Sequence, residues 1–251
     1  MTQQAGRESS KFLSFVIPTR DEAGYIEVTL AALAHDRALH GLDFDIIVAD
    51  GGSHDSTVAL SAAADIVVAG CERAARNIAS GRNVGVERSI AAIIFNTDAD
   101  VFVPQLEALY KDIVLHFADP AVVAAVTRLE PYPWAATWMD RCAHRVINRA
   151  IRLAIPMGAF LARGECLIMR RSAFDVIGGF DERLALCEDA DLLRRLRRVG
   201  KVRFLADRYV YHSPRRFHAC GYTRCLGYLI REIVWLRILH RPYLTQWKVI
   251  R

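Results

Sequence analysis

Short runs of apolar residues alternate with longer, helix-like stretches through the first half of the chain. The apolar runs predict four strands, at residues 12–18, 44–50, 65–70 and 91–98. Their unbroken hydrophobicity is typical of strands that are covered on both faces, as in a parallel sheet. The stretches between them predict helices at residues 22–40, 56–64 and 73–87. This repeated β–α–β order predicts an α/β fold with a doubly wound sheet and helices on both faces.

The second half of the chain mixes the two patterns. It predicts helices at residues 134–155, 187–199 and 222–240, and strands at residues 165–171 and 202–211. We therefore expect one domain over residues 12–217, preceded by a flexible polar tail at residues 1–11. An apolar, amphipathic helical segment is expected to follow it, at residues 218–251.

Polar or turn-forming residues directly follow three of the predicted strands, at positions 18–22, 50–53 and 98–100. The carboxyl ends of neighbouring parallel strands meet at one edge of a sheet, where α/β proteins bind their ligands. We therefore expect these three turns to form one site. The glycines of the second turn allow close backbone approach to a ligand, although an ordinary strand-to-helix turn has the same composition.

Asp98 and Asp100 are the first candidates for chemistry in that site. Alternation along an extended segment places residues i and i+2 on the same side. Two carboxylates there can hold a hard divalent cation, Mn²⁺ or Mg²⁺, which can in turn hold a diphosphate. His212, after the last predicted strand, is a candidate third ligand. A chance pair of surface acids and a structural histidine are the alternative interpretations.

Two further clusters are suited to the same reaction. Glu188 and Asp189 begin a predicted helix, where a carboxylate is either simply favoured by the helix dipole or serves as a general base. Arg215 and Arg216 follow the last predicted strand. Their planar guanidinium groups could neutralise phosphates there.

Seven segments of the chain resemble, in order, the motifs of the inverting family 2 glycosyltransferases of the GT-A fold. They are FVIPTRDEAGYI, IIVADGGSHDST, ASGRNVGVERS, IIFNTDADV, GECLIMRRSAFDVIGGFDE, CEDADLLRRLRRVG and VYHSPRRF. Each motif is weak alone, but seven in the right order and spacing over residues 12–217 are a strong signal. The resemblance implies a GT-A type, Rossmann-like mixed sheet and a nucleoside-diphosphate-sugar donor, with a UDP-sugar as the default.

The resemblance also implies roles for individual residues. Nucleotide-sugar binding falls to Pro18, Thr19, Arg20, Glu22, Asp50, Gly52, Arg82, Asp98, Arg215 and Arg216. Asp98 and Asp100 match the DxD pair, with Asp100 the better candidate for direct contact with Mn²⁺ or Mg²⁺. His212 lies in the segment that closes over the donor phosphates. Glu188 and Asp189 match the pair that supplies the catalytic base, and Asp189 is favoured.

The chain departs from the family pattern in two places. The family often has Asn where this chain has Asp21, which could alter the first turn. The QxxRW motif of processive polysaccharide synthases is absent, and SPRRF stands in that region. A single transfer per acceptor is therefore expected, onto a hydroxyl of an unidentified glycan or lipid-linked acceptor.

Two other classes of protein share some of these features. A nucleotidyltransferase of similar topology would also use a metal and an α/β sheet, but it usually carries a glycine-rich basic loop after the first strand. PTRDEAG is a poor match to such a loop. A nucleic-acid-binding module would explain basic character, but no recognition motif is present, so we expect no nucleic-acid partner.

Charge is divided unevenly along the chain. Residues 1–140 hold 10 basic and 19 acidic residues, whereas residues 141–251 hold 23 and 9. The basic half favours an anionic partner such as a diphosphate or a membrane surface, with a solvated basic face as the alternative. A helix at residues 134–155 would carry aromatic and arginine side chains on one face, at Trp134, Trp138, Arg141, Arg145, Arg149 and Arg152. Such a face suits a membrane headgroup region.

The remaining sequence features bear on location. No apolar run is long enough to predict a membrane span, and the polar start does not resemble a secretory signal. The six cysteines have neither CxxC nor zinc spacing, which favours buried thiols in a reducing compartment. We therefore expect a cytoplasmic protein, with peripheral contact to the cytoplasmic face of the membrane.

Overall fold

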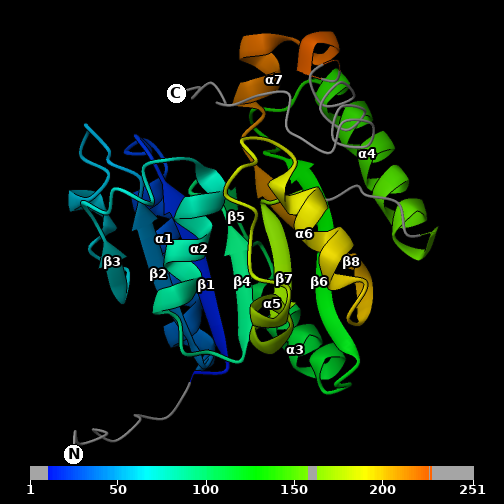
Figure 1. The fold of residues 1–251 in the computed structure, drawn as a ribbon. Coiled ribbons are helices and arrows are strands. Elements are labelled where there is room, and N and C mark those ends of the chain that lie inside the picture. Colours follow the sequence, from blue (N-terminus) through cyan, green and yellow to red (C-terminus); the bar gives the residue numbers. More distant parts are fainter. Residues whose placement is uncertain (1–10, 158–162, 226, 228–251) are drawn as a thin grey trace, which may run out of the picture.

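The structure, a computed structural model, describes residues 11–157, 163–225 and 227. A central sheet of eight strands, in the order β3-β2-β1-β4-β7-β6-β8-β5, runs through this part of the chain (Figure 1). The strands are β1 Leu13–Thr19, β2 Phe44–Asp50, β3 Ile66–Val68, β4 Ile93–Thr97, β5 Val101–Phe102, β6 Val122–Pro131, β7 Cys166–Arg170 and β8 Lys201–His212.

The sheet combines parallel and antiparallel pairing. Strand β1 pairs in parallel with β2 and β4, and β2 pairs in parallel with β3. Strand β7 is antiparallel to both of its neighbours, β4 and β6. Beyond it, β6 and β8 are parallel, and the short β5 is antiparallel to β8. The predicted mixed α/β sheet is therefore confirmed.

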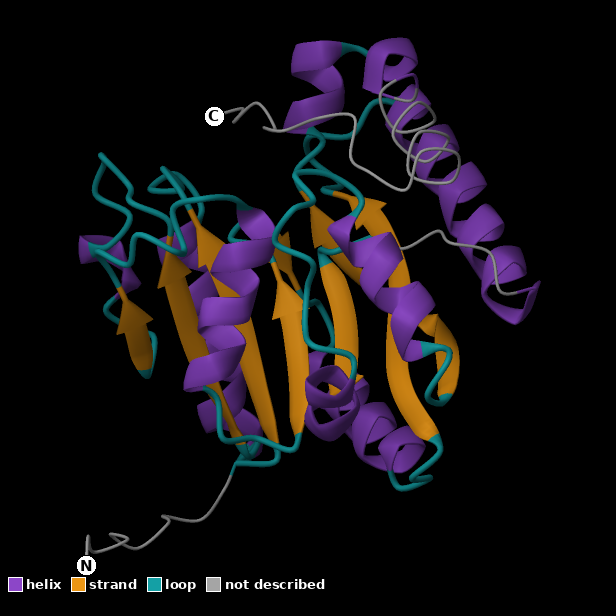
Figure 2. Cartoon of the chain, in the orientation of Figure 1, coloured by secondary structure: helices purple, strands orange, loops and turns teal. Residues whose placement is uncertain are grey.

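Helices cover both faces of the sheet (Figure 2). They are α1 Ile26–His40, the 3₁₀ turn η1 Ala59–Ser61, α2 Ile78–Arg88, α3 Leu106–Phe117, α4 Trp138–Met157, α5 Arg171–Val176, α6 Glu188–Leu196 and α7 Arg215–Cys220. None of these helices is long and apolar enough to cross a membrane.

Alternation along β1 explains the two layers of helices. Leu13, Phe15 and Ile17 point to one face and pack with the buried residues of α1 and α3. Val16 points to the other face and packs with residues of α2, α4, α5 and α6. Successive residues of a strand point to opposite faces, so the unbroken apolar run of β1 supplies both cores.

Several element boundaries differ from those predicted. The stretch at residues 56–64 forms only the short turn η1, because Asp55, Thr57 and Ser61 bond one another's polar groups in place of a regular helix. Helix α2 begins at Ile78, where the Asn77 side chain caps the backbone. Helix α3 and strands β5 and β6 were not predicted. The predicted tail, except its last residue, and most of the segment 218–251 lie outside the described residues.

Candidate active site

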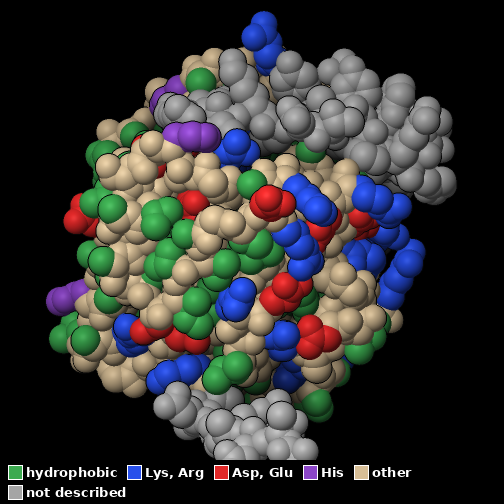
Figure 3. All heavy atoms as spheres, turned by 60° about the vertical axis from the view of Figure 1, so that its left-hand side comes forward, with side chains coloured by type: hydrophobic (Ala, Val, Ile, Leu, Met, Phe, Trp, Pro, Cys, Tyr) green, Lys and Arg blue, Asp and Glu red, His purple; other side chains and the backbone are tan. Residues whose placement is uncertain are grey.

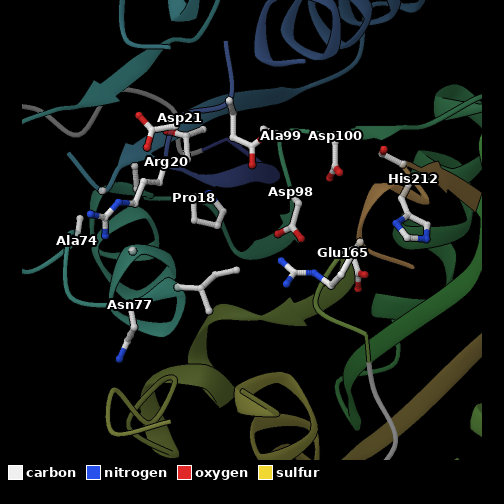
Figure 4. Close-up of a pocket in the computed structure, with 18 of the residues that line it drawn as sticks. Pro18, Arg20, Asp21, Ala74, Asn77, Asp98, Ala99, Asp100, Glu165 and His212 are labelled. Atoms are coloured by element: carbon white, nitrogen blue, oxygen red, sulfur yellow. The ribbon is translucent and has the colours of Figure 1, made fainter. Parts of the chain in front are cut away.

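A cavity of about 870 Å³ opens at the carboxyl ends of the parallel strands. All three predicted turns line it, through residues 18–22, Gly51 and residues 98–100. Figure 4 shows Arg20, Ala74 and Asn77 on one side of the cavity, opposite Asp100 and His212 on the other. The three separate turns therefore line one cavity, as the order of the strands predicts.

The first turn is shaped by Asp21, which adopts a left-handed backbone conformation with φ of 55°. Its Oδ1 accepts a hydrogen bond from the backbone of His54, and its own amide donates to Ser53 Oγ. Asn and Asp are the non-glycine residues that adopt this conformation most readily. The replacement of the family's Asn by Asp21 is therefore accommodated.

The Asp50 carboxylate points toward the backbone of the loop that follows it. It accepts hydrogen bonds from the amides of Gly52 and Ser53, both 3.0 Å, and from the hydroxyls of Ser53 and Thr19. Asp50 is buried, and Gly52 has a φ of 81° that favours glycine. In this conformation both residues shape the wall of the cavity, while Thr19 and Gly51 line it.

Each carboxylate of the DxD pair contacts an arginine. Asp98 Oδ1 lies 3.0 Å from Arg82 Nη2, and Asp100 Oδ2 lies 3.1 Å from Arg215 Nε. Burial, together with the charges of Asp98 and Glu22, raises the pKa of Asp100 to about 7, although Arg215 opposes the shift. The pair is therefore short of positive charge even with both arginines in place.

Arg82 connects the DxD pair to the predicted catalytic pair. Its guanidinium is fully buried and donates to Glu188 Oε1 at 2.6 Å as well as to Asp98. The Phe180 ring packs 5.5 Å from it. A Cβ atom at Gly164 would come within 2.4 Å of the guanidinium, so any larger residue there would displace Arg82 from this position. Arg82 holds two carboxylates in place behind the cavity wall rather than lining the cavity.

Glu188 and Asp189 begin helix α6, as predicted. The preceding residue, Cys187, has a φ of 61°, which is rare for a side-chain-bearing residue and is a form of strain found at functional sites. Glu188 accepts a hydrogen bond from Arg82, whereas the Asp189 carboxylate accepts one from the neighbouring amide of Ala190, at 2.6 Å. Burial and the charge of Glu188 raise the pKa of Asp189 to about 8.

The structure does not assemble His212 into a metal site. Its Nε2 lies 2.7 Å from Nε2 of His144 and 3.3 Å from Arg163. Burial and the charge of Arg163 lower the pKa of His212 well below its usual range. Within the described ranges, no group of three or more His, Cys, Asp or Glu side chains is placed to hold a metal ion. In this conformation Asp98, Asp100 and His212 are therefore not a joint ligand set.

Arg215 and Arg216 line the cavity from helix α7. Arg215 donates to both oxygens of Glu22, at 2.7 and 2.8 Å, and stacks on the Tyr25 ring at 4.7 Å. Together with its contact to Asp100, this places one guanidinium across the cavity mouth between two acidic walls. Arg215 therefore contacts the DxD pair directly, and Arg216 lines the same cavity.

Three residues of the site were not predicted. Glu165 lines the cavity and pairs with Arg163 at 3.1 Å, while His144 reaches the site from α4. Burial opposes ionisation of Glu165, but the charge and hydrogen bond of Arg163 outweigh it and lower the pKa to about 2, so the carboxylate is ionised. In the sequence, Arg163 and Glu165 flank Gly164 directly before a buried strand, and this pair of charges could have indicated that part of the site. No pattern marked His144.

Comparison with known proteins agrees with this geometry. The sequence profile of Glycosyl transferase family 2 matches residues 14–178. The chain belongs to this family.

Two known proteins are similar in sequence. The O-antigen chain rhamnosyltransferase RfbN of Salmonella typhimurium is 27% identical over 207 residues, which are 70% of this chain and 63% of RfbN. The succinoglycan biosynthesis protein ExoA of Rhizobium meliloti is 28% identical over 204 residues, 77% of this chain and 60% of ExoA. The family 2 chain therefore spans about three fifths of the length of these relatives.

Solved structures show the same fold. The mannosyltransferase PcManGT from Pyrobaculum calidifontis, in complex with GDP-Man and Mn²⁺, superposes with a TM-score of 0.63 at 19% identity, covering 92% of this chain and 69% of that one. Residues 1–349 of S. aureus TarS, in complex with UDP-GlcNAc, give a TM-score of 0.59 at 16% identity, covering 92% and 67%. The fold of this family 2 chain is thus the fold of both proteins.

Proposed function

We propose that the protein transfers a single sugar from a nucleoside-diphosphate-sugar to an acceptor hydroxyl, with inversion at the anomeric carbon. One observation carries the proposal. The buried Arg82 joins Asp98 of the DxD pair to Glu188 of the ED pair, beside a cavity large enough for a nucleotide sugar. The donor phosphates would thus lie close to the carboxylate that deprotonates the acceptor hydroxyl.

The donor nucleotide is expected between the first two turns. Pro18, Thr19 and Arg20 line this end of the cavity together with Gly51 and Asn77. Their backbone groups and side chains offer both donors and acceptors to a base and ribose. UDP remains the default nucleotide, and the complexes with GDP-Man and UDP-GlcNAc show that this fold accommodates either base.

A divalent cation fits the charge balance of the inner cavity. Four carboxylates line it, at Glu22, Asp98, Asp100 and Glu165, and two more lie outside the lining, at Glu188 and Asp189. Their ion pairs involve three arginines, Arg82, Arg163 and Arg215. Asp98 and Asp100 would hold Mn²⁺ or Mg²⁺ as oxygen ligands. When bound, the cation would neutralise the charge that develops on the leaving diphosphate.

Asp189 is proposed as the general base. Arg82 engages the Glu188 carboxylate, whereas the Asp189 carboxylate accepts a hydrogen bond from the amide of Ala190. A pKa raised to about 8 suits a base that must hold a proton from an acceptor hydroxyl near neutral pH. The acceptor oxygen would attack the anomeric carbon as the nucleoside diphosphate departs.

A thermal-shift screen of nucleoside diphosphates, with and without Mn²⁺ or Mg²⁺, tests the proposed donor class. A ligand at 100 times its dissociation constant should stabilise the protein by about 2.7 kcal/mol. Slow hydrolysis of the matching nucleotide sugar would then establish donor use. A protein that is stabilised by nucleoside triphosphates but by no diphosphate or nucleotide sugar would contradict the proposal and favour nucleotidyl transfer.

Replacing Arg215 with Ala is expected to weaken nucleoside-diphosphate binding about tenfold or more and to leave nucleoside binding nearly unchanged. The reason is that a charge-assisted hydrogen bond contributes roughly 1.5–3 kcal/mol. Arg216→Ala should act in the same direction. Arg208→Ala, which removes a similarly buried arginine paired with Asp112, is the matched control. Equal losses for diphosphate and nucleoside would assign Arg215 to the fold instead.

Helix α4 supports a proposed peripheral contact with the membrane. Trp138, Met139, Val146 and Leu153 are each more than half exposed. The four arginines predicted on this helix, Arg141, Arg145, Arg149 and Arg152, are also exposed. At 100° per residue the apolar side chains form one stripe and the arginines an adjacent one. On the face shown in Figure 3, by contrast, basic and acidic side chains are intermixed.

The exposed face of α4 carries no acidic side chain. Its single acidic residue, Asp140, is fully buried. Trp134 precedes the helix and stacks on Tyr132 with ring centroids 4.6 Å apart, so the predicted stripe begins at Trp138. Adjacent apolar and arginine stripes are typical of a helix that lies in a lipid headgroup region. An acceptor that is lipid-linked would be delivered at such a surface.

Flotation with anionic liposomes at ~0.15 M salt is expected to recover the protein with the lipid, since each basic residue near the surface contributes about 1 kcal/mol. Arg145→Glu combined with Arg149→Glu should abolish this. Arg183→Glu combined with Lys201→Glu makes the same charge change at other exposed sites and serves as the control. Recovery in the soluble fraction on anionic vesicles, even at low salt, would exclude membrane contact.

A further inference from the structure

Asp140, at the start of α4, is a fully buried carboxylate outside the cavity lining. Its Oδ2 accepts hydrogen bonds from the backbone and hydroxyl of Thr137, at 2.7 and 2.6 Å. It also accepts from His218 Nε2 at 2.9 Å and from the Tyr222 hydroxyl. Burial raises the pKa of Asp140, but these hydrogen bonds outweigh it and hold the pKa below its ordinary value. The group is therefore an ionised anchor.

Two of those donors come from the segment that carries the cavity arginines. We call residues 213–222 the closing segment. It contains α7, with Arg215 and Arg216 at its start and His218 in its last turn. Phe217 stacks on Tyr222 with ring centroids 5.1 Å apart, and it also meets the edge of His144. Figure 1 shows α7 directly beside the start of α4.

The closing segment is held at two ends. At its inner end Arg215 bonds Glu22 and Asp100 across the cavity. At its outer end His218 and Tyr222 bond Asp140. Helix α4 is a firm base for this outer contact, because Ile151 is buried in the core and Asn148 bonds the backbone of β6.

Binding of the proposed donor would release the inner end. A diphosphate competes with Glu22 and Asp100 for the guanidinium of Arg215, and so does a cation for Asp100. Once those ion pairs are exchanged, the contacts of Asp140 with His218 and Tyr222 still hold the closing segment near the phosphates. Pre-ordering a segment lowers the entropy that binding must overcome.

We propose that Asp140 is a positioning residue, which holds the closing segment through His218 and Tyr222 so that Arg215 and Arg216 meet the donor phosphates. This inference rests on the proposed nucleotide-sugar function. It adds a residue on α4 that contacts neither donor nor acceptor. Because the anchor acts on phosphate contacts, its loss should raise the donor KM and change kcat little.

The test is the double variant His218→Ala/Tyr222→Phe. It removes both outer hydrogen bonds, keeps the ring that stacks on Phe217, and leaves the buried Asp140 in place. The control His40→Ala/Tyr110→Phe removes the same groups from partly exposed contacts elsewhere. Calorimetry should show nucleoside-diphosphate affinity about tenfold weaker in the test variant only, with nucleoside affinity unchanged.

Amide hydrogen exchange without any ligand supplies a second readout. Residues 215–221 should exchange faster in the test variant than in the wild type or the control, because their segment has lost its outer attachment. Unchanged exchange would overturn the inference, and so would an equal loss of nucleoside and diphosphate affinity. If the wild type binds no nucleoside diphosphate at all, the proposed function fails. The exchange comparison would still decide whether Asp140 anchors the segment.

Discussion

Asp189→Asn is expected to lower turnover by roughly two to four orders of magnitude, the range usual for loss of a general base. Donor binding should remain close to normal, because the substitution keeps the size of the side chain and does not touch the ion pairs of Arg82. Steady-state kinetics with the donor found by the screen would measure both quantities. Asp191→Asn, on the same helix but paired with Arg194 and Arg195, should change turnover only slightly.

The pH profile gives an independent check on this assignment. Burial and the neighbouring Glu188 raise the pKa of Asp189 to about 8. The protonated form cannot accept a proton, so activity should rise with pH and level off above about 8. The rise should be absent from the residual activity of Asp189→Asn. An active Asp189→Asn together with an inactive Glu188→Gln would transfer the role of base to Glu188.

Asp100→Asn should abolish the metal-dependent part of nucleoside-diphosphate binding. Carboxylate oxygens are the ligands that Mn²⁺ and Mg²⁺ prefer, and an amide removes the negative charge while keeping the shape. Isothermal titration of the nucleoside diphosphate with Mn²⁺ and with EDTA would separate the two parts. Asp112→Asn, which alters a carboxylate that pairs with Arg208, is the matched control.

Two results would contradict this prediction. Wild-type affinity that is the same in Mn²⁺ and EDTA would show that the site binds its ligand without a cation, and the arginines would then carry the phosphates alone. Retention of metal dependence in Asp100→Asn would move the ligand to Asp98 or to another carboxylate of the cavity. The second conclusion requires that the variant is still folded, which its melting temperature would show.

Most of the sheet could be predicted because its strands are buried on both faces. The apolar runs of β1, β2 and β4 have no polar alternation and are too short for helices, so their assignment was unambiguous. Strand β6 was missed, because Val122–Pro131 begins as Val-Val-Ala-Ala, with two alanines that are depleted in strands, and continues with the polar residues Thr127, Arg128 and Glu130. The predicted helix at residues 56–64 failed since side chains there bond the backbone locally.

The turns that line the cavity could be predicted from the strand topology. The long-range contacts behind its wall could not. Residues that directly follow parallel strands must share an edge of the sheet, so Asp21, Asp50 and Asp98 could be grouped from sequence. The contact between Arg82 and Glu188 joins residues 106 positions apart. No periodic pattern in the sequence indicates a contact over such a separation. The facing rings of His144 and His212 are a similar case, since a lone histidine carries no signal of its partner.

The burial of carboxylates in and behind the cavity wall opposes folding, and their mutual repulsion adds to the cost. Asp100 and Asp189 both have raised pKa values, which means that each ionised group destabilises the folded chain as pH rises past the ordinary carboxyl range toward 7 or 8. A bound cation would offset part of this cost, and a donor that binds only the folded chain would stabilise it further, so both would favour folding. A cell short of nucleotide sugar would then lose folded enzyme to proteolysis as well as flux. Enzyme abundance would follow donor supply without any dedicated regulator.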